Sequence, residues 1–217
     1  MNRMNIFLTD KEEFFLRKII GLYEKDADET VKLNLETVEN LLEAIHKINP
    51  KILEHSFRVA VKCVQIATEL KFNSDKIKTI ALGSLLHDIG VIGTKSDLFR
   101  RERKWDKDEF TEYYKHTNLG KEIIEPISSS FLGKTIPFIE KHHEYLNGSG
   151  YPNALREQNI PFEVRILTVV NDFDMMSELF PWGEKYPFDK CIETIKKNSS
   201  ILYDAKVVEQ LLKLVGR

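Results

Sequence analysis

Apolar residues recur at helical spacing along most of this chain of 217 residues, and no segment shows the convincing alternation of apolar and polar residues that a half-buried strand requires. The stretch from Glu29 to about Lys47 illustrates the pattern, with apolar residues such as Val38, Leu42 and Ile45 spaced three or four apart among charges. The sequence therefore predicts an all-α fold. Its length suits one well-buried domain with a short appendage.

Prolines, glycines and helix-capping residues mark the ends of further expected helices in the rest of the chain. Asn73-Ser74-Asp75 is a plausible helix cap, and Asp106 and Glu109 have the spacing of a capping box. The other expected helices run from Lys11 to Tyr23, from Pro50 to Leu70, from the Asn73 cap to His87, from Asp106 to His116, from Pro137 to His143, from about Phe162 past Asp174, and near 190–197 and 206–214.

Five of the six histidines fall where a buried metal cluster would need them. His87-Asp88 ends an apolar run and His142-His143 precedes a glycine-rich loop, so both pairs are expected at helix ends. Neighbouring side chains on a helix point about 100° apart, but they can converge where the backbone turns. Histidine with carboxylate suits iron, manganese or zinc. Separate, hydrogen-bonded histidines are the alternative, yet two adjacent pairs together with the two single histidines, His55 and His116, favour a metal cluster.

Charge and hydropathy exclude several classes of protein. The chain has 32 Lys and Arg against 34 Asp and Glu, so it lacks the basic excess of a nonspecific nucleic-acid binder, and no duplex nucleic acid is expected as a partner. No window approaches eighteen uninterrupted apolar residues, and charges interrupt the start too early for a signal peptide. We expect a cytoplasmic protein without a membrane partner, in which Cys63 and Cys191 are buried free thiols.

Five stretches, in order and spacing, resemble the HD-GYP domain, the bacterial branch of the HD metal-dependent phosphohydrolases. They are HSFRVA at 55–60, LLHDIG at 85–90, HTNLG at 116–120, HHEYLNGSGYP at 142–152 and IPFEVRI at 160–166. The resemblance covers about residues 34–217 and implies an HD-GYP-like helical bundle. Residues 1–33 are then an N-terminal helical extension, expected to cover the core or a dimer contact in a possible homodimer.

The resemblance implies two divalent metal ions, iron or manganese in the first place, with zinc or nickel as alternatives in a purified sample. It also implies hydrolysis of cyclic di-GMP to pGpG or GMP. Two such ions can hold a bridging hydroxide between them. By similarity, His55, His87 and Asp88 would bind one ion, while Asp88 bridges to a second ion. The ligands of that second ion would be His116, His142 and His143.

The same resemblance assigns roles outside the histidines. A loop with Gly148, Gly150, Tyr151 and Pro152 would lie over the substrate. The Tyr151 phenol would donate a hydrogen bond to a phosphate, or alternatively anchor a turn. Asp174 matches an aspartate close to the metals, and its catalytic role would be proton transfer to the leaving oxygen; a helix-surface carboxylate is the alternative.

The chain also departs from the family pattern. Asn171 occupies the position of the last metal-binding aspartate; its amide oxygen can coordinate but carries no charge, so the ion at His55, His87 and Asp88 should bind less tightly. Asp172 lies about 100° round the helix and cannot replace it. Lys51, in place of a glutamate, argues for two metals at most. Val91 replaces a lysine, while Phe180 and Gly183 replace basic residues for which Lys185, Arg100, Arg101 or Arg103 could substitute.

These residues leave three functions open. The leading hypothesis is a phosphodiesterase that uses a dinuclear metal centre on a cyclic dinucleotide. The second is a catalytically degenerate domain that binds metal or nucleotide and docks on a partner, such as a GGDEF-domain protein. The third is a phosphohydrolase of another nucleotide, since fold and motif alone do not fix the substrate. The basic stretch from Arg100 to Lys104 is interpreted as a solvated loop, with a phosphate contact as the alternative.

Overall fold

The computed structural model describes residues 29–95, 98–100, 104–127, 132–178 and 185–217, and within these ranges it consists of helices and loops without a β-strand. The predicted all-α fold is confirmed. The α-helices are α2 (Glu29–Ile48), α3 (Pro50–Glu69), α4 (Ser74–Leu86), α5 (Lys107–Tyr114), α6 (His116–Ile124), α7 (Ile136–Lys141), α8 (Phe162–Ser177), α9 (Phe188–Lys197) and α10 (Ala205–Leu214). Short 3-10 helices η1 to η5 cover Ile89–Gly93, Leu98–Arg100, Glu125–Ile127, Leu132–Thr135 and Glu157–Asn159.

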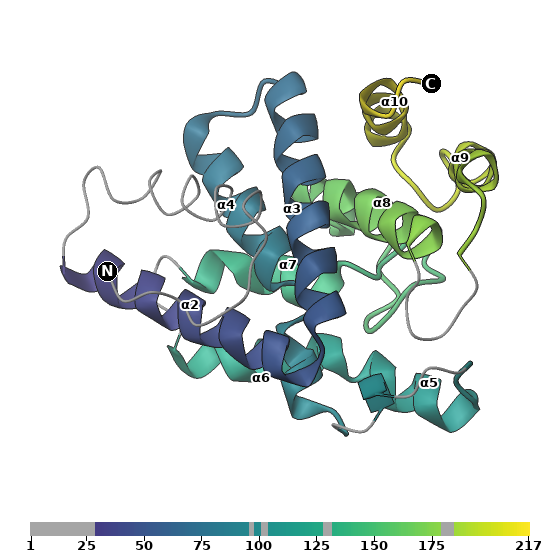
Figure 1. Cartoon of the computed structure of the whole chain (residues 1–217). Coiled ribbons are helices and arrows are strands. Elements are labelled where there is room, and N and C mark those ends of the chain that lie inside the picture. Colours follow the sequence, from purple (N-terminus) through teal and green to yellow (C-terminus); the bar gives the residue numbers. More distant parts are fainter. Residues whose placement is uncertain (1–28, 96–97, 101–103, 128–131, 179–184) are drawn as a thin grey trace.

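Helix α3 is the centre of the bundle and packs against α2, α4, α8 and α10 (Figure 1). The side chain of Asn49 caps its start by accepting a hydrogen bond from the Lys51 N–H at 2.9 Å, and Pro50 occupies the first turn, where its missing N–H costs nothing. Apolar residues on more than one face of α3 are buried. The helix can therefore contribute to two separate hydrophobic clusters.

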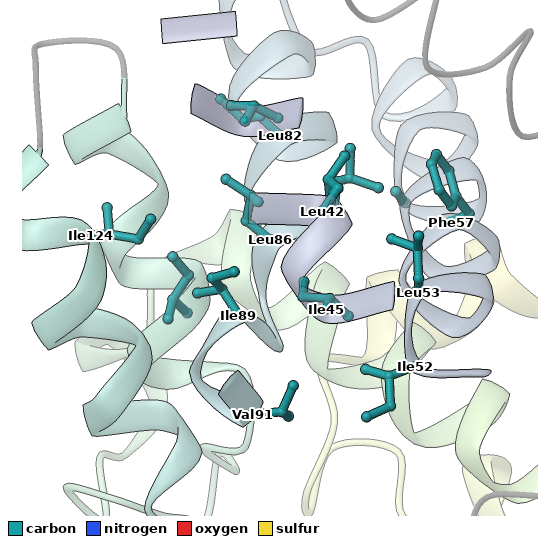
Figure 2. Close-up of a cluster of buried hydrophobic side chains, with 14 of the residues drawn as sticks. Leu42, Ile45, Ile52, Leu53, Phe57, Leu82, Leu86, Ile89, Val91 and Ile124 are labelled. Carbon is teal, nitrogen blue, oxygen red and sulfur yellow. The ribbon is translucent and has the colours of Figure 1, made fainter. Parts of the chain in front are cut away.

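The two clusters lie on different sides of α3. In the first, Leu42 and Ile45 of α2 pack among Leu53 and Phe57 of α3 and Leu86 of α4 (Figure 2). The second joins the remaining buried face of α3 to the last three helices, through residues such as Cys63, Ile66, Val169, Ile195 and Leu211. This packing fixes the positions of α4 and α8 relative to α3, and these three helices carry several of the polar residues described below.

Most of the local sequence predictions are confirmed. Asn73 caps α4 through its side chain, and Asp106 and Glu109 form a complete capping box at α5. Helices α8 and α10 begin close to the expected residues. One difference occurs near His116, where α5 ends at Tyr114 and a separate helix, α6, starts at His116 itself. The histidine is therefore placed at the start of a new helix.

Some expectations remain predictions. The helix expected from Lys11 to Tyr23 lies outside the described residues, and α2 begins at Glu29 and crosses the expected boundary between residues 33 and 34. The two cysteines are buried free thiols, as predicted, and burial raises the pKa of Cys63 to about 12. No helix in the described part of the chain is both long and apolar enough to cross a bilayer.

Candidate metal centre

The ends of three helices bring their histidines to one face of α3. His87 directly follows α4, His116 begins α6, and His142 and His143 directly follow α7. The fifth histidine, His55, lies inside α3. All five side chains are buried, as is Asp88. The prediction that both adjacent pairs lie at helix ends is therefore confirmed.

Backbone carbonyls in the preceding turn orient three of the imidazoles. The Nδ1 atoms of His87 and His116 lie 2.7 Å from the Ser84 oxygen and 2.6 Å from the Tyr113 oxygen. His142 Nδ1 lies 3.0 Å from the carbonyl oxygens of both Phe138 and Ile139. Because a carbonyl can only accept, Nδ1 carries the proton in each neutral ring, and Nε2 is left as the electron-pair donor. Metal-binding histidines usually donate their other ring N–H to a carbonyl or carboxylate in this way, which fixes the orientation of the ring.

The potential ligands form two groups. His55, His87 and Asp88 make up the first, and His116, His142 and His143 the second; within each group the donor atoms lie within 4.8 Å of one another. Asp88 faces both groups. Its Oδ2 lies 3.3 Å from His87 Nε2, and its Oδ1 lies 3.4 Å from His116 Nε2 and 3.6 Å from His142 Nε2. A single carboxylate is thus positioned to serve two ions.

The protonation of the second ligand group suits divalent metal. Burial lowers the pKa of His116 to about 3 and holds the pKa of His143 well below its ordinary value, so these rings are neutral at pH 7. Burial would raise the pKa of Asp88, but the neighbouring His87 and the hydrogen-bonding His142 outweigh it and hold that pKa low. Moreover, His87 Nε2 and Asp88 Oδ1 are buried without a hydrogen-bond partner among the residues described. Such atoms are costly unless a ligand satisfies them, and a divalent ion would do so.

Asn171 and Asp174 share one face of α8, as predicted, and both contact His55. The Oδ1 atom of Asn171 lies 2.9 Å from His55 Nε2, which brings an amide oxygen to the first ligand group. Asp172 points elsewhere. Its carboxylate accepts hydrogen bonds from the hydroxyls of Tyr145 at 2.9 Å and Tyr203 at 2.8 Å. The structure thus separates Asp172 from the histidines.

Asp174 contacts the Nδ1 side of the His55 ring, opposite the Nε2 atom that faces Asn171, and it also pairs with two cations. Its carboxylate is 2.9 Å from His55 Nδ1, 2.8 Å from Arg58 Nη2 and 3.0 Å from Lys62 Nζ. Burial would raise the pKa of Asp174, but the hydrogen bond with His55 and the two cations outweigh it and lower that pKa. Sequence reasoning gave Arg58 and Lys62 no role, although their spacing of three and seven residues from His55 places them on one face of α3.

The glycine-rich loop packs directly on the second ligand group. A Cβ atom at Gly150 would lie 2.3 Å from the His143 carbonyl oxygen, so the loop can approach this closely only with glycine. Gly148 has a φ of +79°, which also favours glycine. The Tyr151 ring stacks on His143 at 4.6 Å, and its hydroxyl is buried without a hydrogen-bond partner in the described part of the chain. Pro152 follows in the same loop.

Glu144, whose role the sequence did not reveal, holds this loop in place. Its buried carboxylate accepts hydrogen bonds from the backbone N–H groups of Asn153 at 2.6 Å and Leu155 at 2.8 Å. A charged acceptor that binds two N–H groups makes stronger hydrogen bonds than a neutral one. The residue directly after His143 therefore ties the loop to the end of α7.

The other positions that depart from the family pattern do not bring cations to the site within the described residues. Val91 is buried in the first hydrophobic cluster, and Lys51 is exposed. Lys185 lies 3.4 Å from Glu178. Phe180, Gly183, Arg101 and Arg103 lie outside the described residues, as does the side chain of Arg100.

Comparison with known proteins places this chain in a family. A family model described as HD domain matches residues 38–207. A cyclic di-GMP phosphodiesterase of Thermotoga maritima is 30% identical over 203 residues, which cover 92% of this chain and 55% of that protein. A 3'3'-cGAMP-specific phosphodiesterase of Vibrio cholerae is 27% identical over 86% of this chain and 35% of its own length. The chain thus spans about half or less of these relatives.

A solved structure supports the fold. An HDG"Y"P protein of Bdellovibrio bacteriovorus superimposes with a TM-score of 0.65 over 97% of this chain and 82% of its own, at 16% sequence identity. The match confirms the helical bundle that the resemblance implied. The family model spans all the histidines of both ligand groups, so sequence and fold agree on the family. The chain belongs to the HD domain family.

Proposed function

We propose that this chain is a metal-dependent phosphodiesterase that hydrolyses a cyclic dinucleotide, with cyclic di-GMP as the first substrate to test. The observation that carries the proposal is the pair of buried ligand groups on either side of Asp88. Two ions held in this way match the requirements of phosphodiester hydrolysis. The relatives named as phosphodiesterases of cyclic di-GMP and 3'3'-cGAMP support the choice of substrate class.

In this proposal, His55, His87, Asp88 and Asn171 hold one ion, and His116, His142 and His143 hold the other together with Asp88. Iron or manganese fits these ligands, since imidazole nitrogen and carboxylate oxygen are mixed in each set. When bound, two divalent ions supply Lewis-acid stabilisation of the charge that develops on the phosphodiester. In the reaction, water adds to phosphorus and one phosphorus–oxygen bond to ribose breaks, which leaves a linear dinucleotide.

Two residues near the ions have proposed roles other than metal binding: Asp174 orients a ligand, and Tyr151 contacts the substrate. Asp174 accepts from His55 Nδ1 and is kept ionised by Arg58 and Lys62, an arrangement that favours orientation of the imidazole. Proton transfer by Asp174 to the leaving oxygen remains a prediction from the resemblance. The Tyr151 hydroxyl, buried beside His143, would donate to a substrate phosphate, and Gly148, Gly150 and Pro152 would shape the loop that carries it.

Turnover of cyclic di-GMP tests this function. Protein reconstituted with manganese or with ferrous iron should convert it to pGpG or GMP, as followed by chromatography of the nucleotides, and metal-free protein should not. 3'3'-cGAMP should be assayed in parallel, because the relatives include enzymes named for it. If elemental analysis shows two bound ions per chain and neither cyclic dinucleotide is cleaved, the proposal is wrong.

A second candidate function follows from Asn171. With a neutral amide in the first ligand group, that ion binds less tightly, and a domain that binds cyclic dinucleotide without cleaving it becomes the alternative. Such a domain would act by docking on a partner, for example a GGDEF-domain protein. Binding of cyclic di-GMP without turnover would favour this candidate, whereas rapid turnover would eliminate it.

A further inference from the structure

Two consecutive tyrosines end α5 and point in different directions, as neighbours on a helix do. Tyr113 is buried: its ring stacks on the His116 imidazole with 4.4 Å between centroids, and its hydroxyl oxygen lies 3.4 Å from His143 Nε2. Tyr114, in contrast, is 46% exposed. The resemblance assigned no role to Tyr114. An exposed aromatic ring is thus placed one residue away from a side chain that contacts the second ligand group.

A row of aromatic rings joins Tyr114 to the second ligand group. The Tyr151 ring stacks on His143 with 4.6 Å between centroids and 19° between planes. The Tyr114 ring in turn lies against Tyr151, with 4.4 Å between centroids and 41° between planes. Exposure rises along this row, since His143 is buried, Tyr151 is half-buried and Tyr114 is exposed. The row therefore runs outward from a proposed metal ligand to the surface of the molecule.

Packing holds the Tyr114 ring in position. Phe110, four residues earlier on the same face of α5, lies 6.4 Å from it between centroids, and Tyr151 contacts it from the glycine-rich loop. Single exposed apolar residues are ordinary on a protein surface, but this ring is fixed against two others and lies beside a proposed metal centre. A ring positioned in advance loses little conformational entropy when a flat ligand binds to it.

The chemistry of the proposed substrate supplies such a flat ligand. In a nucleotide the ribose separates the base from the phosphate, so a base cannot lie among the ions that hold its phosphate and must be bound farther out. Aromatic side chains bind nucleobases by stacking, which tolerates different bases because every base has a π-face. Tyr114 offers such a ring at the outer end of the row, with Tyr151 between it and His143.

We propose that Tyr114 is the platform on which one purine base of the cyclic dinucleotide stacks while the neighbouring phosphate occupies the metal centre. This inference rests on the proposed function and deepens it, because it assigns a binding residue to a part of the substrate that the ions do not touch. Stacking does not read the hydrogen-bonding edge of a base. Cyclic di-GMP and 3'3'-cGAMP should therefore depend on Tyr114 to a similar degree.

The test measures the affinity of manganese-loaded protein for the bisphosphorothioate analogue of cyclic di-GMP, which resists hydrolysis, by titration calorimetry. Tyr114→Leu keeps an apolar side chain but removes the ring, and it should weaken binding by about tenfold or more. Tyr114→Phe keeps the ring and should bind within about twofold of wild type. The corresponding analogue of 3'3'-cGAMP should show the same pattern with both variants.

Two controls separate base stacking from damage to the metal centre. Phe188→Leu makes the same kind of change at another exposed ring, which lies on α9 and packs edge-on against Phe173, and it should leave the affinity for the analogue unchanged. Inorganic phosphate contains no base, so it should bind manganese-loaded Tyr114→Leu and wild type equally.

The outcomes distinguish this inference from the proposed function. Equal affinity of Tyr114→Leu and wild type for the analogue overturns the inference, and so does an equal loss in Tyr114→Phe or a matching loss of phosphate binding. If wild type binds the analogue through Tyr114 but does not cleave cyclic di-GMP, only the proposed hydrolysis fails. If wild type cleaves cyclic di-GMP and Tyr114→Leu binds the analogue as tightly, only the inference fails. Wild type that does not bind the analogue contradicts both.

Discussion

Asp88→Asn is expected to empty both ligand groups and to reduce hydrolysis of cyclic di-GMP by at least about 10³-fold. Asp88 is the carboxylate that approaches both sets of histidines, with its two oxygens 3.3 Å from His87 Nε2 and 3.4 Å from His116 Nε2. An amide of the same shape removes its negative charge and offers only one oxygen. Elemental analysis after dialysis should therefore show less than one ion per chain, and the hydrolysis assay should show the loss of activity.

Asp172→Asn is the matched control for this prediction. Asp172 is a partly buried aspartate on an element that lines the site, but its oxygen accepts from Tyr145 and Tyr203 and does not face the histidines. The control should keep its metal and its activity to within a few fold. If Asp88→Asn retained two ions per chain, Asp88 would not be the shared ligand.

Asn171→Asp is expected to raise the affinity of the first ligand group for a divalent ion by about tenfold or more, because a charged oxygen replaces a neutral one. The oxygen at this position lies 2.9 Å from His55 Nε2, inside that group. Tenfold tighter binding corresponds to about 1.4 kcal/mol, so saturating metal should raise the melting temperature of the variant more than that of wild type. Titration with manganese, followed by calorimetry, measures the affinity directly.

Asn159→Asp adds the same charge at an exposed position on η5 and serves as the control. It should leave the manganese affinity unchanged. Equal affinities of Asn171→Asp and wild type would show that residue 171 does not bind the ion. A gain in activity that accompanies the gain in affinity would identify Asn171 as the reason for a weak wild-type enzyme.

The sequence predicted most of the described helices, and it predicted that the histidines of the proposed site lie close together, because both depend on local order along the chain. Asn73 and Asp106 mark the starts of helices because their own side chains accept hydrogen bonds from backbone N–H groups of the first turn. His87 and His142 could be placed at helix ends because apolar periodicity stops there, and Asn171 and Asp174 could be placed on one face because they are three residues apart.

The residues that the sequence did not reveal act across the fold. Arg58 and Lys62 meet Asp174 only because α3 packs on α8, more than a hundred positions away in the chain. Glu144 binds the backbone of a loop whose path no local pattern specifies. Tyr113 is three residues from His116, yet its phenol contacts His143 only because α5 and the end of α7 converge. Such contacts require the packed structure.

Anomalous X-ray diffraction from crystals of manganese-loaded protein tests the central claim most directly. The account predicts two anomalous peaks, one among His55, His87 and Asp88 and one among His116, His142 and His143, with Asp88 between them and the first peak of lower occupancy. A single peak that does not contact Asp88, or no peak at these histidines in protein that contains manganese, would contradict it.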